Sequence, residues 1–88
     1  MTNIALVDDE ESILTSVSLS LESEGFKVDT FINGVDALEA LEKKSYDLGL
    51  FDIKMPKMDG NELLNKVRSS KIEKLKELPI IFLTSKDQ

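Results

Sequence analysis

The sequence predicts an α/β fold, a parallel β-sheet with helices on both of its faces. Short apolar segments typical of buried strands alternate, over 88 residues, with stretches whose apolar residues recur at helical spacing. The resulting order, β-α-β-α-β-α-β, fits few sheet topologies because strand–helix–strand crossovers are right-handed. The length suits one small domain, and no repeat or linker divides it.

Three of the four predicted strands are continuous apolar runs, residues 4–7, 48–51 and 80–83. Such runs suit strands that are buried on both faces of a parallel sheet. Residues 27–31 alternate polar and apolar instead, which favours a half-exposed edge strand. We therefore expect the first and third strands near the centre of the sheet. The polar segment 69–77 predicts either a helical extension or a solvated connection.

Three helices are predicted between the strands. Residues 12–24 and 35–44 carry apolar residues at helical spacing, and Gly25 is the residue expected just past a helix end. Asp59 followed by Glu62 resembles a capping box, which predicts that a third helix begins there.

The composition restricts the chemistry. Seventeen acidic against 11 basic residues leave a net charge of −6, which disfavours nucleic-acid binding by this segment alone. The absence of Cys and His excludes disulfides, thiolate zinc sites, a cysteine nucleophile and a histidine base. No apolar run approaches the ~20 residues of a membrane span, and no signal-peptide pattern is present. We expect a cytoplasmic protein without membrane contact.

Three carboxylates follow two of the predicted central strands. Asp8 and Asp9 come after the first strand, and Asp52 ends the third. Ligands bind open α/β sheets at the carboxyl ends of the strands, where the strand order reverses. Converging carboxylates raise one another's pKa or recruit a cation. An all-oxygen site without His or Cys favours Mg²⁺.

These side chains also have structural explanations. An acid after a strand commonly caps the next helix, and Asp9 could do so for the helix beginning near Ser12. Three acids at corresponding strand ends nevertheless favour a metal site. A carboxylate facing Mg²⁺ can also attack a phosphoryl group, which is a further interpretation of Asp52. Thr84, after the last strand, either donates its hydroxyl to that phosphoryl group or merely terminates the strand.

Three segments of the sequence resemble the receiver domain of two-component response regulators. They are residues 4–10, the Asp-x-x-Met-Pro-x-Met-Asp-Gly string from Asp52 to Gly60, and residues 82–85. The resemblance covers the whole chain and is strongest to DNA-binding regulators with a winged-helix output domain. It implies a flavodoxin-like (CheY-like), doubly wound parallel sheet.

The resemblance also implies a role for each candidate site residue. Asp52 would be the phosphoacceptor, phosphorylated from a phosphohistidine on a sensor histidine kinase. Asp9 and Asp52 would bind Mg²⁺ directly together with the backbone carbonyl of Lys54, and Asp8 would act through a metal-bound water. Thr84 would be the switch hydroxyl that moves toward the phosphoryl group.

Further family positions are implied in the same way. Pro56 and Gly60 would shape the loop after the acceptor, Asp59 would cap the third helix, and Lys54 and Lys86 would tune the loss of the phosphoryl group. The chain would be a phosphoacceptor and not an enzyme acting on an external substrate. It would control transcription and contact DNA only through an output domain that lies outside this chain.

The chain departs from the family in length. A complete receiver has about 120 residues, with five strands and five helices, whereas this sequence ends soon after the fourth strand. The family's invariant lysine after the fifth strand has no counterpart, because Lys86 lies too early. We expect residues 1–88 to be a partial receiver domain in which residues 80–83 form an exposed apolar edge. Either the chain is a fragment of a longer regulator, or another chain covers this edge, including by self-association.

Two alternative functions remain open. A covalent-aspartate phosphohydrolase also uses a strand-end Asp with Mg²⁺, but it resembles a pattern with a second acid where this chain has Lys54. The other alternative is a receiver-like interaction domain that has lost switching. The three acids argue against that alternative, and the missing lysine argues for it.

Overall fold

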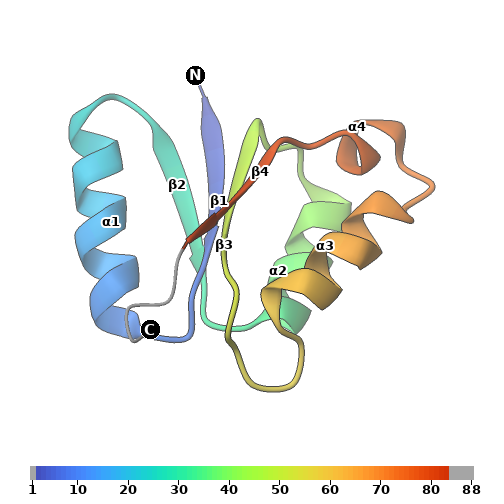
Figure 1. Ribbon diagram of the computed structural model, residues 1–88. Coiled ribbons are helices and arrows are strands. Elements are labelled where there is room, and N and C mark those ends of the chain that lie inside the picture. The colour runs from blue at the N-terminus through green and yellow to red at the C-terminus, as the bar shows by residue number, and fades with distance from the viewer. Residues whose placement is uncertain (1, 84–88) are drawn as a thin grey trace.

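The computed structural model describes residues 2–83 as a four-stranded parallel sheet with helices on both faces (Figure 1). In chain order the elements are β1 (Asn3–Val7), α1 (Glu11–Ser23), β2 (Lys27–Phe31), α2 (Gly34–Lys43), β3 (Leu48–Asp52), α3 (Gly60–Arg68), α4 (Glu73–Lys76) and β4 (Ile80–Leu83). The strand order is β2-β1-β3-β4, and the predicted doubly wound fold is confirmed. Within residues 2–83, no helix is long and apolar enough to cross a lipid bilayer.

Strand β1 lies at the centre of the sheet because its side chains are apolar on both faces. Ala5 and Val7 point into the cluster beneath α2 and α3, whereas Ile4 and Leu6 point into the cluster beneath α1. All four side chains are at most 1% exposed. Strand β2 has no fully buried residue, which agrees with its predicted place at an edge.

The two faces of the sheet are covered unequally. Helices α2 and α3 pack together on one face, and α1 packs on the other face against β2 and β1 (Figure 1). On the α1 side, residues 2–83 cover β4 only in part, since Leu83 packs against the cluster there but Ile81 is 54% exposed. Among residues 2–83, β4 pairs with β3 alone. Within residues 2–83, β4 is therefore the apolar edge strand that the sequence predicts.

One predicted helix cap is present and another is wrong. Asp59 caps α3, because its Oδ1 accepts a hydrogen bond of 2.9 Å from the backbone N–H of Glu62. Asp9 does not cap α1, whose cap position is Glu10 and has no side-chain cap bond. The backbone N–H of Glu10 instead donates to Oδ1 of Asp8 at 2.9 Å. Asp8 thus shapes this turn, and Asp9 is left exposed.

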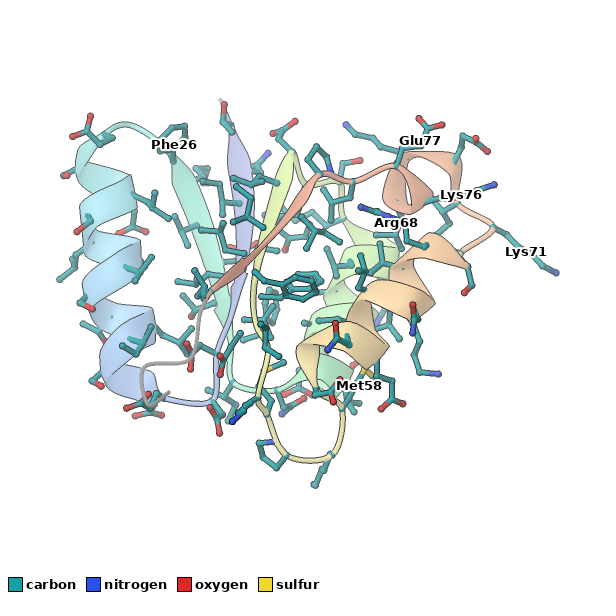
Figure 2. All side chains as sticks on the ribbon, in the orientation of Figure 1. Phe26, Met58, Arg68, Lys71, Lys76 and Glu77 are labelled. Atoms are coloured by element: carbon teal, nitrogen blue, oxygen red, sulfur yellow. The ribbon has the colours of Figure 1, made fainter. Side chains whose placement is uncertain are left out.

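The segment between α3 and β4 is neither a continuation of α3 nor a simple solvated connection. It contains the four-residue helix α4, and Leu75 and Leu78 reach the core from it. The guanidinium of Arg68 donates to the carbonyl of Lys76 at 3.0 Å and ties α4 to the end of α3 (Figure 2). Leu75, Leu78 and this hydrogen bond hold the segment against the domain.

Candidate functional site

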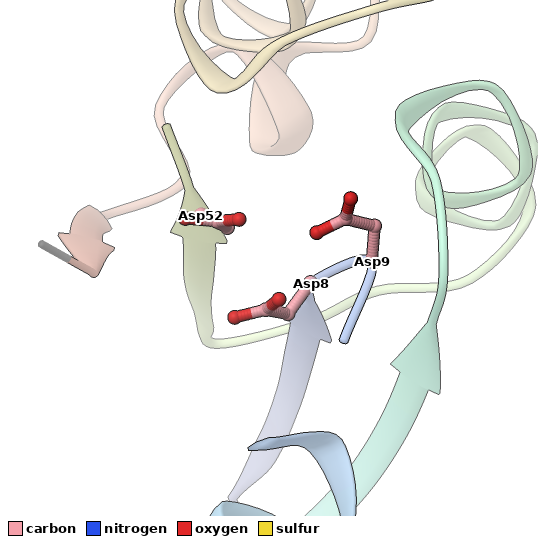
Figure 3. A group of neighbouring side chains, drawn as sticks. All are labelled: Asp8, Asp9 and Asp52. Carbon is pink, nitrogen blue, oxygen red and sulfur yellow. The ribbon is translucent and has the colours of Figure 1, made fainter. Parts of the chain in front are cut away.

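The carboxyl ends of β1 and β3 bring three carboxylates together (Figure 3). Asp8, Asp9 and Asp52, hereafter the acid cluster, each place a carboxylate oxygen within 4.8 Å of the other two. The parallel register explains this convergence, because Val7 pairs with Phe51 and the acids follow at the same level. The strand order also reverses here, since β1 separates β2 from β3.

The three acids differ in their surroundings. Asp8 is buried at 3% exposure, and its backbone N–H donates to the carbonyl of Phe31 at 3.0 Å. Asp9 is exposed, and Asp52 is half-buried at the end of β3. The acid cluster is therefore anchored by Asp8 and open to solvent on the side of Asp9.

The electrostatics of the acid cluster favour a cation. Burial raises the pKa of Asp52, and the negative charges of Asp8 and Asp9 raise it further. Hydrogen bonds from the backbone N–H groups of Ile53 and Lys54 oppose this rise in the pKa of Asp52. Because the donor set consists of carboxylate oxygens, a hard divalent cation is the ligand that it fits best.

The loop after β3 closes tightly over the backbone of Asp52. The N–H of Gly60 donates to the carbonyl of Ile53 at 2.9 Å. A Cβ at Gly60 would collide with the carbonyl oxygen of Asp52 and approach Cα of Ile53 to 3.0 Å. Met55 and Met58 anchor the loop, since both are 8% exposed and belong to the core. A glycine is therefore required where α3 begins.

A strained turn lies at the tip of this loop. Lys57 has a φ of 69°, the left-handed region that a side chain disfavours. The N–H of Met58 donates to the carbonyl of Pro56 at 2.8 Å, which closes a three-residue turn around Lys57. A γ-turn with positive φ is a rare and strained arrangement.

The structure brings some of the predicted site residues together and does not describe others. It brings Asp8, Asp9 and Asp52 together, and it places Lys54 two residues beyond Asp52 with an exposed side chain. Thr84 and Lys86 lie outside the described residues. The backbone carbonyl of Phe31, which holds Asp8, was missed. No pattern in one sequence reveals it, because it depends on the register between β1 and β2.

Comparison with known proteins shows the family of the chain. The family model of the response regulator receiver domain matches residues 4–88. The probable transcriptional regulator ycf29 of Porphyra purpurea is 42% identical over 96% of this chain and 39% of its own length. The alkaline phosphatase synthesis transcriptional regulatory protein PhoP of Bacillus subtilis is 40% identical over 97% of this chain and 34% of its own length.

A solved structure of a response regulator has the same fold as this chain. The response regulator TrrA of Thermotoga maritima, in complex with Mg(2+)-BeF, is 38% identical, with a TM-score of 0.87 over 96% of this chain and 70% of that chain. The chain belongs to the response regulator receiver domain family. It spans little more than a third of the length of the curated relatives it matches. The comparisons favour neither the phosphohydrolase nor the non-switching interaction domain.

Proposed function

We propose that the chain accepts a phosphoryl group on the carboxylate of Asp52, as a module of a two-component phosphorelay. The acid cluster carries this proposal, because its carboxylate oxygens lie within 4.8 Å of one another at the carboxyl edge of the sheet. Membership of the receiver family supports it. Asp52 ends β3 and is half-buried, so a donor in solvent can reach its carboxylate.

In the proposed reaction, a carboxylate oxygen of Asp52 attacks the phosphorus of a phosphohistidine on a sensor histidine kinase. The phosphorus–nitrogen bond breaks, its electron pair stays on the imidazole nitrogen, and an acyl phosphate forms on Asp52. Asp8 and Asp9 would repel the phosphoryl oxygens, so positive charge is needed within the acid cluster.

Mg²⁺ is the cofactor that we propose for this site. Asp9, Asp52 and the backbone carbonyl of Lys54 would hold the ion directly, and Asp8 would hold it through a bound water. When bound, Mg²⁺ neutralises charge on the phosphoryl oxygens. The oxygen-only donor set and the raised pKa of Asp52 support the assignment.

Thr84 is the proposed switch hydroxyl. It follows Leu83, whose Cα pairs with that of Asp52 in the register between β3 and β4. We propose that its hydroxyl donates to an oxygen of the phosphoryl group on Asp52. Lys54 and Lys86 would set how fast that phosphoryl group is lost.

The 88 residues are proposed to be a partial receiver domain within a longer regulator. The place of β4 at the end of the strand order and the 54% exposure of Ile81 support a further covering element. That element is either a continuation of the same polypeptide or another chain, including a second copy. Control of transcription then belongs to an output domain, which alone contacts DNA.

The remaining parts of the proposal follow from the role of a phosphoacceptor. The chain has no external substrate, and its chemistry is limited to its own phosphorylation and dephosphorylation. We place the chain in the cytoplasm, where it would meet the phosphohistidine of the sensor kinase. No DNA or membrane contact is assigned to these residues themselves.

The test is phosphorylation of the purified chain by acetyl phosphate with Mg²⁺, followed by measurement of intact mass. We expect one phosphoryl adduct in the unmodified chain, no adduct in Asp52→Asn, and no adduct when Mg²⁺ is chelated. Asp59→Asn is the matched control, because Asn preserves the cap of α3. An adduct that persists in Asp52→Asn, or none in a folded unmodified chain, contradicts the proposal. Steady hydrolysis of small phosphate esters would support a phosphohydrolase instead.

A further inference from the structure

Two exposed apolar side chains lie where β2 leads into α2, Ile32 in the connection and Val35 in the first turn of α2. Ile32 is 49% exposed and Val35 is 51% exposed, and we call this pair the apolar rim. The carbonyl of Phe31, the residue before Ile32, accepts the 3.0 Å hydrogen bond from the backbone N–H of Asp8. The apolar rim therefore begins one residue from a direct contact with the acid cluster.

The junction that carries the apolar rim is held in place at its centre. Oδ1 of Asn33 accepts a 2.7 Å hydrogen bond from the backbone N–H of Asp36 and caps α2. Gly34 is buried, and a Cβ there would lie 3.0 Å from the carbonyl oxygen of Met58. Because Met58 belongs to the loop that follows Asp52, the start of α2 lies against the β3–α3 connection.

The charge at this edge opposes the approach of a phosphorylated partner. Asp8, Asp9 and Asp52 are all acidic, and the phosphoryl group of a donor is itself an anion. A protein donor must therefore draw favourable binding free energy from other contacts, and burial of apolar surface supplies it. Of the exposed large hydrophobic side chains among residues 2–83, Ile32 and Val35 are the two at the junction of β2 and α2, which lies at this edge of the sheet.

We propose that the apolar rim, Ile32 and Val35, contacts the phosphohistidine-bearing protein that donates the phosphoryl group to Asp52. This inference rests on the proposed phosphoacceptor function. Transfer requires the donor phosphorus to come within about 3–3.5 Å of the Asp52 carboxylate, so a protein donor must cover the surface around it. A donor as small as acetyl phosphate reaches the same carboxylate without covering the apolar rim.

The experiment compares a small donor with a protein donor. The full chain and its Ile32→Ser/Val35→Ser double variant are phosphorylated by acetyl phosphate with Mg²⁺. They are then phosphorylated by an autophosphorylated sensor kinase, chosen as the one in a kinase panel that transfers fastest to the unmodified chain. Ile72→Ser is the matched control, because Ile72 is also about half exposed, at 45%. It precedes α4 and β4, whereas Asp52 lies level with Leu83 at the far end of β4.

We expect the double variant to lose about tenfold in the rate of transfer from the kinase, since the apolar contact is worth roughly one factor of ten in binding. Its rate with acetyl phosphate should match that of the unmodified chain. Ile72→Ser should match the unmodified chain with both donors. The single variants Ile32→Ser and Val35→Ser replace the double variant if circular dichroism shows that the double variant is unfolded.

Three results would overturn the inference while leaving the acceptor chemistry intact. They are unchanged kinase transfer in a folded rim variant, equal slowing with both donors, and transfer from acetyl phosphate but from no kinase in the panel. Failure of the proposed function has a different signature, because the unmodified chain would then form no adduct with either donor. That result would remove the inference as well.

Discussion

The hydroxyl of Tyr46 donates a hydrogen bond of 2.6 Å to Oδ2 of Asp29, the oxygen that also accepts one of 2.8 Å from Nζ of Lys44. These bonds join β2 to the segment between α2 and β3. The bond from Lys44, and then that from Tyr46, lower the pKa of Asp29. Burial and the bond to Asp29 raise the pKa of Tyr46. The link fastens the edge strand to the face of the sheet that carries α2.

Tyr46→Phe should lower the free energy of unfolding by about 1 kcal/mol, because it removes a partly buried hydrogen bond. The hydrogen bonds that Asp29 accepts from Lys44 and Tyr46 should also make stability depend on pH. The pKa of Asp29 is lower in the folded chain than its ordinary value of 3.8, so its carboxylate stabilises the fold above that value. This contribution is lost as the pH falls through the lowered pKa of the folded chain.

Urea denaturation of Asp29→Asn at neutral pH and well below pH 3.8 checks this sign. The variant should be less stable than the unmodified chain at neutral pH, and the difference should shrink in acid. Glu42→Gln, an exposed acid on α2, is the control and should show no such trend. An equal loss in Asp29→Asn at both pH values would show that the ionised form of Asp29 contributes nothing.

Gly60→Ala should lower the free energy of unfolding by about 1–3 kcal/mol, the usual range for forcing an extra carbon into a packed site. The added Cβ would meet the carbonyl of Asp52, so the variant should also slow phosphorylation by acetyl phosphate. Asn61→Ala, one residue later and exposed, should change stability by less than about 0.5 kcal/mol. Thermal denaturation with equal shifts for both variants would refute the steric argument.

Lys57→Gly should raise the free energy of unfolding by about 1 kcal/mol, because glycine adopts the positive φ of 69° without strain. Lys54→Gly is the control in the same loop. Lys54 has a negative φ, so there the substitution should lower stability by about 0.4–1 kcal/mol through the greater freedom of the unfolded chain. Chemical denaturation without Mg²⁺ measures both, and changes of the same sign would count against a strained turn.

Asp52→Asn should have opposite effects on relative stability with and without Mg²⁺. The pKa of Asp52 is raised above its ordinary value of 3.8, so its ionised form destabilises the metal-free fold as the pH rises above that value. Removing the charge should therefore raise the midpoint of thermal unfolding at neutral pH in a chelating buffer, and not below pH 3.8.

With Mg²⁺ present, the order of the two proteins should reverse. Binding to the folded state adds about 2.7 kcal/mol of stability when the ion is at 100 times its Kd. Asp52→Asn removes a carboxylate ligand and should receive much less of this stabilisation. Equal increments from Mg²⁺ in the two proteins would mean that the ion does not bind at the acid cluster.

The sequence predicted the features that depend on the apolar pattern and missed those that depend on register. The buried run of residues 4–7 placed β1 at the centre of the sheet, and the alternation in residues 27–31 placed β2 at an edge. The acid cluster was predictable because the carboxyl ends of neighbouring parallel strands share an edge. The prediction had to assume only that β1 and β3 are neighbours in the sheet.

The errors arose where local signals compete. Asp8 and Asp9 are both good caps, and only the geometry after β1 decides that the N–H of Glu10 bonds to Asp8. Nothing local reveals the bond between Tyr46 and Asp29, since 17 residues separate them. The positive φ of Lys57 was also invisible, because lysine does not favour that region.

The place of β1 in the sheet has a consequence for synthesis of the chain. β1 is made first, yet its neighbour β3 ends only at Asp52, so one side of β1 stays unpaired while residues 32–52 are translated. An unpaired apolar strand edge is a site for aggregation and chaperone binding. Nascent chains stalled after β1 has left the ribosome but before β3 has done so should therefore bind a holdase chaperone more strongly than chains stalled later. The strand order makes this stretch of translation the vulnerable period in the biogenesis of the domain.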